Sequence, residues 1–276
     1  MTQLDFLSEE IAKRYGTVKR ARGSFLYTEK GVRLTDLYQE GGRAILGWGG
    51  NSAFTQFKNV LSRGITGSFP TDFSYRLQKA VSELLASTRK VFVFHTKEAA
   101  LHAVRSCLSK DACVWKPWTD GSVAWSSEDF VVVEPPLPWS GGISILAVRS
   151  DALTDCFSDA LEHMDVPFRS VVVPAPLLAA MTRSVYNMIA AVQEREEKHW
   201  FVYDSVLAKY WTRKGPYLYP KVDMDKYNDF ILHCLDQGIV ISPFYDVPSI
   251  VPFGVDRGVF TKLKNRSFLC QDKEIH

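Results

Sequence analysis

A short polar turn between an apolar segment and a helix is the first place where this sequence could do chemistry. The stretch FVFHTKEAALHAV begins at Phe92, and its turn residues are His95, Thr96 and Lys97. The backbone N–H groups at the start of a helix, a threonine hydroxyl and a lysine ammonium all favour an anion. The turn therefore predicts a phosphate site. In the simpler alternative, Thr96 only caps the helix and Lys97 lies in solvent.

Two further polar residues follow apolar segments later in the chain. Lys116 comes after CVW (113–115), and Glu134 follows FVVV (130–133). Because α/β sheets bind ligands at the carboxyl ends of their strands, Glu134 is a second candidate for a ligand site, although an acid there can equally cap a turn. Lys116 is a candidate reactive amine, and a surface lysine is the alternative.

The candidate residues follow short apolar runs that are rich in Val and Ile. Such runs predict the strands of a buried parallel or mixed sheet. The runs are VFVF (91–94), CVW (113–115), FVVV (130–133) and ISILAV (143–148). Helical periodicity predicts the accompanying helices. These are expected over residues 51–63, 73–85 and 151–164 and along a helical stretch from 174 to 213. The expected class is α/β.

The two ends of the chain have a different pattern, which is typical of a smaller α+β layer. A helix is expected over residues 3–15, strands over 24–27, 32–35 and 239–242, and further helices over 224–235 and 255–264. We expect three regions in all. They are an N-terminal segment with a ribbon (1–72), a reduced large α/β domain (73–213) and a C-terminal small domain (214–276).

The composition is that of an ordinary globular protein, with 46% hydrophobic and 23% charged residues among 276. The net charge of +2 gives no reason to expect nucleic acid or a membrane surface as a partner. The five cysteines are widely spaced, and neither they nor the histidines have a metal-ligand spacing. The N-terminal residues form neither a signal peptide nor a membrane span, so a cytoplasmic location is the expectation.

Several stretches resemble, in the same order, segments of the class III aminotransferases, and most closely the glutamate-1-semialdehyde aminomutases. They are GVRLTDLYQEGGRAILGWGG, GITGSFPTDFSYRLQKAVSELL, KVFVFHTKEAALHAV, FVVVEPP with GGISILAVRSD, and GIVISPFYDVPSIVP. The resemblance implies a pyridoxal phosphate (PLP)-dependent transferase fold of type I. It also implies a small α+β domain built from both chain ends, and a homodimer. In such a dimer the loop containing Gly67, Ser68 and Thr71 would reach the partner's active site.

The resemblance also assigns roles to single positions. The family's phosphate-binding Ser-Gly-Thr corresponds to His95, Thr96 and Lys97. Trp48 stands where a histidine is common; its ring could stack on a cofactor, or it could pack against the ribbon. Asp246 lies where the family has a glutamate near the cofactor, and a role in a turn is the alternative.

The catalytic lysine of the family has no counterpart in this sequence. Its position falls near Leu137, and no lysine occurs between Lys116 and Lys198. The family's "D-E-V" acid also lacks a match, because the segment before FVVV is too short for the family's central insert. PLP chemistry needs a lysine amine and an acid against the pyridine nitrogen. The large-domain sheet is therefore expected to be reduced and its catalytic part absent.

Three functions remain open at the level of sequence. The first is an aminotransferase-like protein without transaminase activity, which binds a small phosphorylated or anionic ligand or none. The second is a PLP enzyme that uses a displaced lysine, with Lys116 as the candidate, or holds PLP noncovalently. The third is an interaction subunit of a full-length aminotransferase. The cofactor, if one is bound, is unknown, with noncovalent PLP as the candidate.

Overall fold

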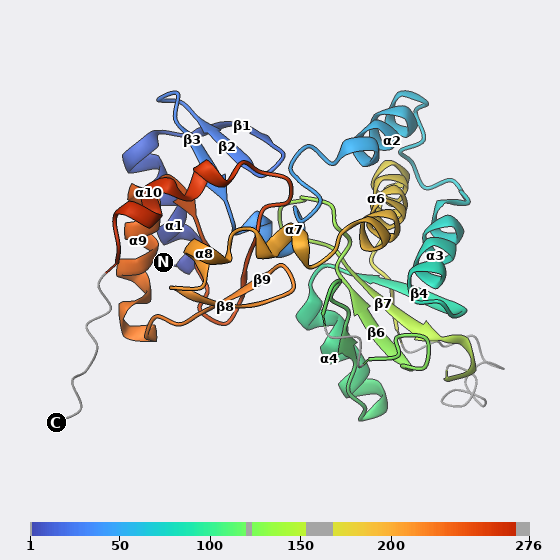
Figure 1. Cartoon of the computed structure of the whole chain (residues 1–276). Coiled ribbons are helices and arrows are strands. Elements are labelled where there is room, and N and C mark those ends of the chain that lie inside the picture. Colours follow the sequence, from blue (N-terminus) through green and yellow to red (C-terminus); the bar gives the residue numbers. More distant parts are fainter. Residues whose placement is uncertain (1, 120–122, 153–167, 269–276) are drawn as a thin grey trace. The chain divides into compact units, whose positions relative to one another are not determined.

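The computed structural model describes residues 2–119, 123–152 and 168–268, and the chain divides into two compact units (Figure 1). One unit combines the two ends of the chain, residues 1–49 and 195–276, and the other is the continuous segment 50–194. The domain limits expected at residues 72 and 213 stay a prediction. The helix expected over residues 151–164 lies almost entirely outside the described residues.

The unit built from both chain ends contains two small sheets. The first has the order β1–β2–β3–β10, in which β10 pairs with β3 in parallel and the other pairs are antiparallel. Its strands are β1 (Val18–Arg22), β2 (Phe25–Thr28), β3 (Arg33–Asp36) and β10 (Ile239–Val240). The second sheet is antiparallel, in the order β11–β9–β8. Its strands are β8 (Trp211–Lys214), β9 (Tyr217–Pro220) and β11 (Ser249–Ile250).

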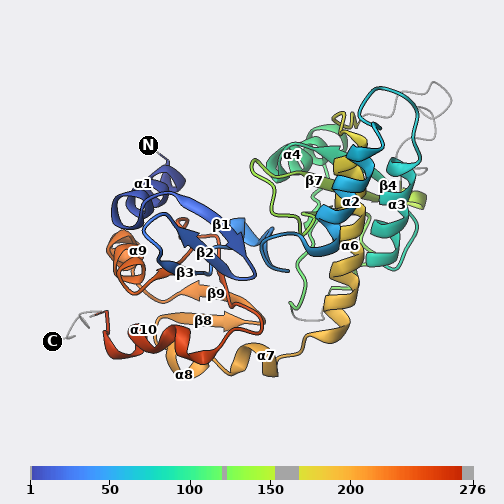
Figure 2. The same ribbon diagram turned by 90° about the horizontal axis from the view of Figure 1, so that it is seen from above.

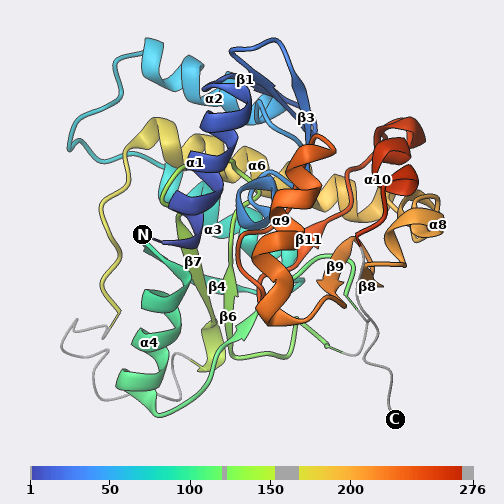
Figure 3. The same cartoon turned by 90° about the vertical axis from the view of Figure 1, so that its left-hand side faces the viewer.

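Helices from both ends of the chain accompany these sheets. α1 (Gln3–Tyr15) and α9 (Tyr227–Asp236) lie side by side (Figures 2 and 3), and an ion pair of 2.9 Å joins Arg14 Nε to Asp236 Oδ1. The shorter helices of this unit are η1 (Gln39–Gly42), α7 (Lys198–Phe201), α8 (Asp204–Leu207), η2 (Met224–Lys226), η3 (Arg257–Phe260) and α10 (Thr261–Asn265). The capping box formed by Thr2 and Asp5 fixes the start of α1, so the helix expected over residues 3–15 is confirmed.

One expected helix is wrong at its end. The helical stretch expected up to residue 213 stops with α8, and Trp211–Lys214 forms strand β8. The physical reason is the hairpin with β9, in which Trp211 pairs with Pro220 and Lys214 with Tyr217 across a turn at Gly215. Trp211 is 1% exposed, so burial of its aromatic ring overrides the local helical pattern.

The continuous unit is built on a mixed sheet, as expected from the apolar runs. Its strand order is β4–β7–β6–β5, with β7 antiparallel to both neighbours and β5 parallel to β6. The strands are β4 (Arg89–Phe94), β5 (Cys113–Val114), β6 (Phe130–Val133) and β7 (Ser144–Arg149). β4, β5 and β6 therefore run in one direction, and their carboxyl ends lie at the edge of the sheet where β7 begins.

Helices cover both faces of this sheet, which explains why its strands are apolar throughout. α4 (Lys97–Leu108) packs on one face, where Phe130, Val132, Leu146 and Val148 form a buried cluster with it. The alternate residues Val131, Val133, Ile145 and Ala147 are 0% exposed on the other face. α3 (Phe73–Leu84) contacts β4, and α2 (Asn51–Ser62) and α3 both pack on the long helix α6 (Ala175–Glu194).

Candidate functional site

The start of α4 is the centre of the candidate site, because the sequence predicts an anion there. Thr96 has extended backbone angles and is the N-cap, and its Oγ1 accepts a hydrogen bond of 3.1 Å from the N–H of Ala99. The hydroxyl hydrogen of Thr96 is not used by this bond. The N–H groups of Lys97 and Glu98 lie in the first turn, where no helix carbonyl can accept from them. His95 precedes the cap, and its side chain is exposed.

The structure brings Lys97 and Glu134 together across the carboxyl edge of the sheet. Lys97 follows β4 and Glu134 follows β6, and their Nζ and Oε2 atoms are 3.9 Å apart. The two side chains are 35% and 28% exposed, so this contact is partly shielded from water. A second acid, Glu98, lies 3.8 Å from Lys97 Nζ but is 76% exposed, and water screens its charge.

Lys116 follows β5 and contributes a second ammonium group to the same edge. Its side chain is half-buried, and burial lowers its pKa below the ordinary lysine value. The neighbouring charge of Lys97 lowers the pKa further, and the Glu134 carboxylate opposes this effect. A lysine with a lowered pKa carries more of the neutral, nucleophilic amine at neutral pH. Three of the residues selected from sequence therefore share one site, although the chain separates them widely.

The segment between β6 and β7 completes this edge. It carries the position near Leu137 to which the resemblance assigns the catalytic lysine; Leu137 is 3% exposed, and Pro135 and Pro136 are also buried. Just before β7, Gly141 and Gly142 have φ values of 77° and 69°, which favour glycine. No heavy atom lies within 4 Å of a Cβ built on Gly141, so the backbone there is open to a ligand.

Trp48 lies in the unit built from both chain ends, and its indole N–H already donates a hydrogen bond within that unit. Its Nε1 donates a hydrogen bond of 2.6 Å to Oδ2 of Asp36, which is 1% exposed. Oδ1 of the same carboxylate accepts from the N–H groups of Tyr38 and Gln39, at 2.9 and 3.0 Å. Burial raises the pKa of Asp36 to about 6, although these three donors pull it the other way.

The hydrogen bonds to the Asp36 carboxylate stabilise a turn whose backbone has an unusual run of positive φ angles. Gln39, Glu40, Gly41 and Gly42 have consecutive φ values of 49°, 52°, 66° and 100°. Left-handed backbone is unfavourable for a residue with a side chain, so Gln39 and Glu40 cost stability that other contacts must offset. The sequence indicates an Asp after a short strand but does not indicate its burial.

The remaining residues selected from sequence lie on exposed segments. Asp246 is exposed in the unit built from both chain ends, next to Tyr245, whose hydroxyl donates to the carbonyl of Val222 at 3.2 Å. In the continuous unit, Gly67, Ser68 and Thr71 are exposed in the loop between α2 and α3. Phe69 in this loop is 84% exposed, which is a large apolar surface for one side chain.

Metal-ligand side chains and long apolar helices were also sought in the described residues. Within residues 2–119, 123–152 and 168–268, no group of three or more His, Cys, Asp or Glu side chains gathers as a metal site would require. The helices in the same described ranges include none with the length and apolar character of a membrane span.

Comparison with solved structures identifies the fold. The chain superimposes on ornithine aminotransferase of Plasmodium yoelii with a TM-score of 0.65 and 13% identity, covering 96% of this chain and 97% of that one. For glutamate-1-semialdehyde aminomutase of Pseudomonas aeruginosa the TM-score is 0.65 at 12% identity, with coverages of 95% and 94%. For acetylornithine aminotransferase of Elizabethkingia anophelis it is 0.62 at 11%, with coverages of 95% and 97%. The chain therefore has the PLP-dependent transferase fold of type I that its sequence predicts.

Two uncharacterised proteins are similar to this chain in sequence. The chain is 29% identical to an uncharacterised protein of Treponema pallidum in an alignment of 281 positions that covers 88% of this chain and 91% of that protein. It is 24% identical to an uncharacterised protein of Borreliella burgdorferi over 265 residues, with coverages of 94% and 92%. No protein-family model matches the sequence.

Proposed function

We propose that this protein uses an aminotransferase fold to bind a small phosphorylated anion at the carboxyl edge of the β4–β7–β6–β5 sheet, without transaminase activity. The observation that carries the proposal is the contact between Lys97 and Glu134 at the start of α4, with Lys116 close enough for both charges to act on the pKa of its ammonium group. Two ammonium groups, the Thr96 hydroxyl and the N–H groups of the first helical turn are suitable donors for a phosphate.

The carboxylate of Glu134 reduces the positive charge of the proposed phosphate site. Lys97 and Lys116 bring two ammonium groups to the edge, and Glu134 is the less exposed of the two carboxylates near Lys97. Glu134 offsets part of that charge, so we expect a weaker phosphate site than one built from cations alone. In return, the carboxylate can orient the Lys97 ammonium toward a ligand placed beside Thr96.

The residues present fit the phosphate of PLP but not the covalent attachment of its ring. The resemblance places the family's lysine near Leu137, in a buried segment that also contains two buried prolines. None of these side chains has an amine. When bound, PLP supplies an electron sink for reactions at an amino-acid Cα, and the chain has no lysine at that position to carry it.

The first test is thermal stabilisation by a phosphorylated probe. At a pyridoxal phosphate concentration about 100 times its Kd, binding adds about 2.7 kcal/mol of stability, which raises the Tm by roughly 5–10 °C for a unit of this size. We expect Lys97→Met to lose most of this shift, because it removes one ammonium from the site. Differential scanning fluorimetry measures it, with inorganic phosphate as the second probe.

Lys90→Met is the matched control, because Lys90 is an exposed lysine on β4, the strand that precedes Lys97. It should keep the full shift. Equal shifts in wild type and Lys97→Met would contradict a phosphate site at the start of α4. A shift with pyridoxal phosphate but none with high inorganic phosphate would mean that recognition lies in the ring and not in the phosphate.

A second function, PLP chemistry with a displaced lysine, is favoured by one observation. The pKa of Lys116 is lowered by its burial and by Lys97, as expected for an amine that attacks a carbonyl. The samples titrated with pyridoxal phosphate are reduced with borohydride and mapped by mass spectrometry. A stoichiometric adduct on Lys116 would establish the displaced lysine and overturn the first proposal, whereas no adduct above the level on exposed lysines such as Lys90 would support it.

The proposal includes a cytoplasmic homodimer in which the loop from Gly64 to Thr71 contacts the partner. The exposed ring of Phe69 supports this, because one protomer leaves it 84% exposed. Light scattering should give twice the chain mass of 31.2 kDa. Phe69→Asp should shift it toward the monomer, while Tyr75→Asp, an exposed aromatic outside the loop, should not. A monomeric wild type would contradict the dimer, and cell fractionation tests the location.

A further inference from the structure

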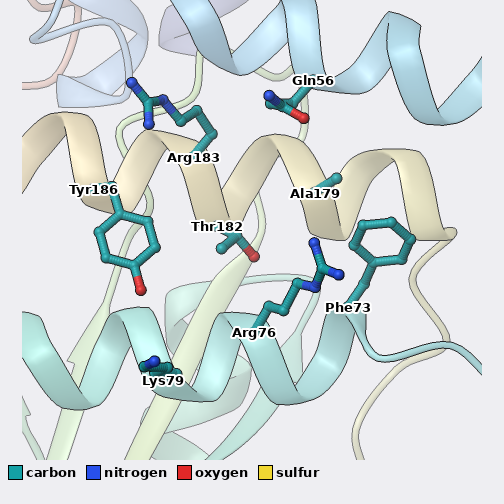
Figure 4. A pocket seen from close by; sticks show the side chains of 8 residues that line it. All are labelled: Gln56, Phe73, Arg76, Lys79, Ala179, Thr182, Arg183 and Tyr186. Atoms are coloured by element: carbon teal, nitrogen blue, oxygen red, sulfur yellow. The ribbon is translucent and has the colours of Figure 1, made fainter.

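A cavity lies among the helices of the continuous unit, and none of the strand-end residues Lys97, Lys116 and Glu134 lines it. It is a groove of about 350 Å³ where α6 passes between α2 and α3 (Figure 4). α2 supplies Gln56, α3 supplies Phe73, Arg76 and Lys79, and α6 supplies Ala179, Thr182, Arg183 and Tyr186. The volume lies within the range of natural small-molecule sites.

The charge of this groove has one sign. Three of its lining residues, Arg76, Lys79 and Arg183, are cations, and none is an acid. Arg76 is paired with Asp72, at 2.6 Å between Nη2 and Oδ2, and this pair is about 59% and 58% exposed. Among the described residues, Lys79 and Arg183 have no ion pair, so their charges are not neutralised by the chain.

Arg183 is held in place without losing its charge. Its Nε donates to Ser52 Oγ at 2.8 Å, and Ser52 Oγ donates to Asn187 Oδ1 at 3.0 Å. A hydroxyl and an amide therefore orient the guanidinium, and within the described part of the chain no hydrogen bond uses its Nη groups. Orientation by neutral groups lowers the entropy lost on binding while the full positive charge remains.

Apolar and hydroxyl groups line the part of the groove that faces α3. Figure 4 shows Thr182 and Tyr186 directed from α6 toward α3, with Tyr186 above Lys79 and Phe73 beside Arg76. Phe73 is 7% exposed and Ala179 6%, so they form an apolar floor. Thr182 Oγ1 already donates to the Leu178 carbonyl at 2.8 Å. The phenol of Tyr186 is therefore the hydroxyl that can donate to a ligand.

We propose that this groove binds a small organic anion, a phosphate or carboxylate carried on an apolar body. The anion would lie on the α3 side of α6, between Lys79 and the Tyr186 hydroxyl, and the apolar body would lie on Phe73 and Ala179. Arg183, which is held on the α2 side of α6, would add a second positive charge to the groove. The proposal does not depend on the strand-end site, since the two sites share no residue.

Isothermal titration calorimetry with phenyl phosphate, benzoate and inorganic phosphate tests the groove. Lys97→Met serves as the starting protein, because it lacks the strand-end ammonium proposed above. We expect one saturable site for phenyl phosphate in this protein, and weaker binding of inorganic phosphate, which lacks the apolar body. Adding Lys79→Met and Arg183→Met should weaken phenyl phosphate at least about tenfold. Tyr186→Phe should weaken it less and leave the fold unchanged. Benzoate shows whether a carboxylate serves as well as a phosphate.

Lys58→Met is the control, since Lys58 is an exposed lysine on α2 outside the lining. Affinity unchanged within about twofold is expected there. Three results would overturn the proposal: no saturable binding in the Lys97→Met protein, an equal loss in Lys58→Met, or unchanged affinity after Lys79 and Arg183 are replaced. If the strand-end site is wrong but the groove is right, Lys97→Met and wild type bind phenyl phosphate identically.

Discussion

Arg89→Met should cost about 3–5 kcal/mol of unfolding free energy, the largest effect that we expect of any single substitution in the continuous unit. Arg89 is 0% exposed and lies at the start of β4, at the opposite edge of the sheet from the candidate site. Its guanidinium reaches the chain that leads into β6. It donates to the carbonyls of Trp125, Ser126, Glu128 and Asp129 and to the hydroxyl of Ser87.

The size of the effect follows from what the substitution leaves behind. Methionine fills a similar volume but donates no hydrogen bonds, so several backbone carbonyls lose a charged donor inside the fold. Arg89→Lys keeps the charge but lacks the fork that spans these carbonyls, and it should cost about 2 kcal/mol. Both variants should make the segment before β6 more mobile. Glu134, which follows β6, should then be less well positioned.

Hydrogen exchange of the β4 amides, such as that of Val91, measures the stability of this unit directly. Arg105→Met is the matched control, because Arg105 is 77% exposed and paired with Asp111, which is 81% exposed. It should change protection by less than about 0.5 kcal/mol. If Arg89→Met and Arg105→Met lowered protection equally, the buried arginine would not anchor the segment.

The second large effect is a pH dependence that comes from Asp36. The pKa of this buried carboxyl is about 6 in the folded protein, and its ordinary value is 3.8. Between these values the folded protein holds a proton that the unfolded chain has released. The stabilisation is therefore complete below pH 3.8 and is lost as the pH rises through 6. From the two pKa values the loss is about 3 kcal/mol.

Asp36→Asn isolates this contribution, because asparagine does not titrate. We expect the unfolding free energy of wild type minus that of Asp36→Asn to fall by about 2 kcal/mol between pH 4 and pH 7, because part of the total change lies below pH 4. In Asp36→Asn, an NH2 group can replace the oxygen that accepts from the Trp48 N–H, so two donors face each other. This lowers the unfolding free energy of the variant by an amount that does not depend on pH. Urea unfolding at each pH gives the difference.

The exposed acid Asp111 provides the control. The same difference for Asp111→Asn should stay constant within about 0.5 kcal/mol. The carboxyl carbon shift of Asp36 in an NMR titration gives its pKa independently. A midpoint below 3.8 would mean that the three hydrogen bonds to the carboxylate outweigh its burial, and the stability difference would then rise with pH.

Local patterns were sufficient for the parts of the fold in which local and tertiary preferences agree. The Val- and Ile-rich runs predict the four strands of the mixed sheet, and Thr96 predicts the start of α4. The segment Trp211–Lys214 was predicted as helix, because its aromatic and basic residues carry no period-two pattern. Its strand pairing depends on Tyr217–Pro220 folding back, which a helical periodicity cannot indicate.

The candidate site was predictable residue by residue but not as an assembly. The sequence places Lys97, Lys116 and Glu134 after apolar segments, which indicates strand ends. Their meeting depends on the strand order β4–β7–β6–β5, and above all on β7 inserting between β4 and β6. The burial of Asp36 and the cations of the helix groove were missed for the same reason. Both depend on residues far apart in the chain.

The unit built from both chain ends has a consequence for synthesis on the ribosome. Ile239 of β10 pairs with Thr35 of β3, and Arg14 bonds Asp236 across 222 positions of sequence. Residues 1–49 are therefore synthesised early but cannot complete their fold until residues 195–276 have been made. Residues 50–194, in contrast, contain the whole of their unit in one uninterrupted segment. The continuous unit, with both proposed ligand sites, can thus assemble first. A translation arrest after residue 194 would leave β1–β3 as a ribbon with an open edge, the kind of surface on which nascent chains aggregate.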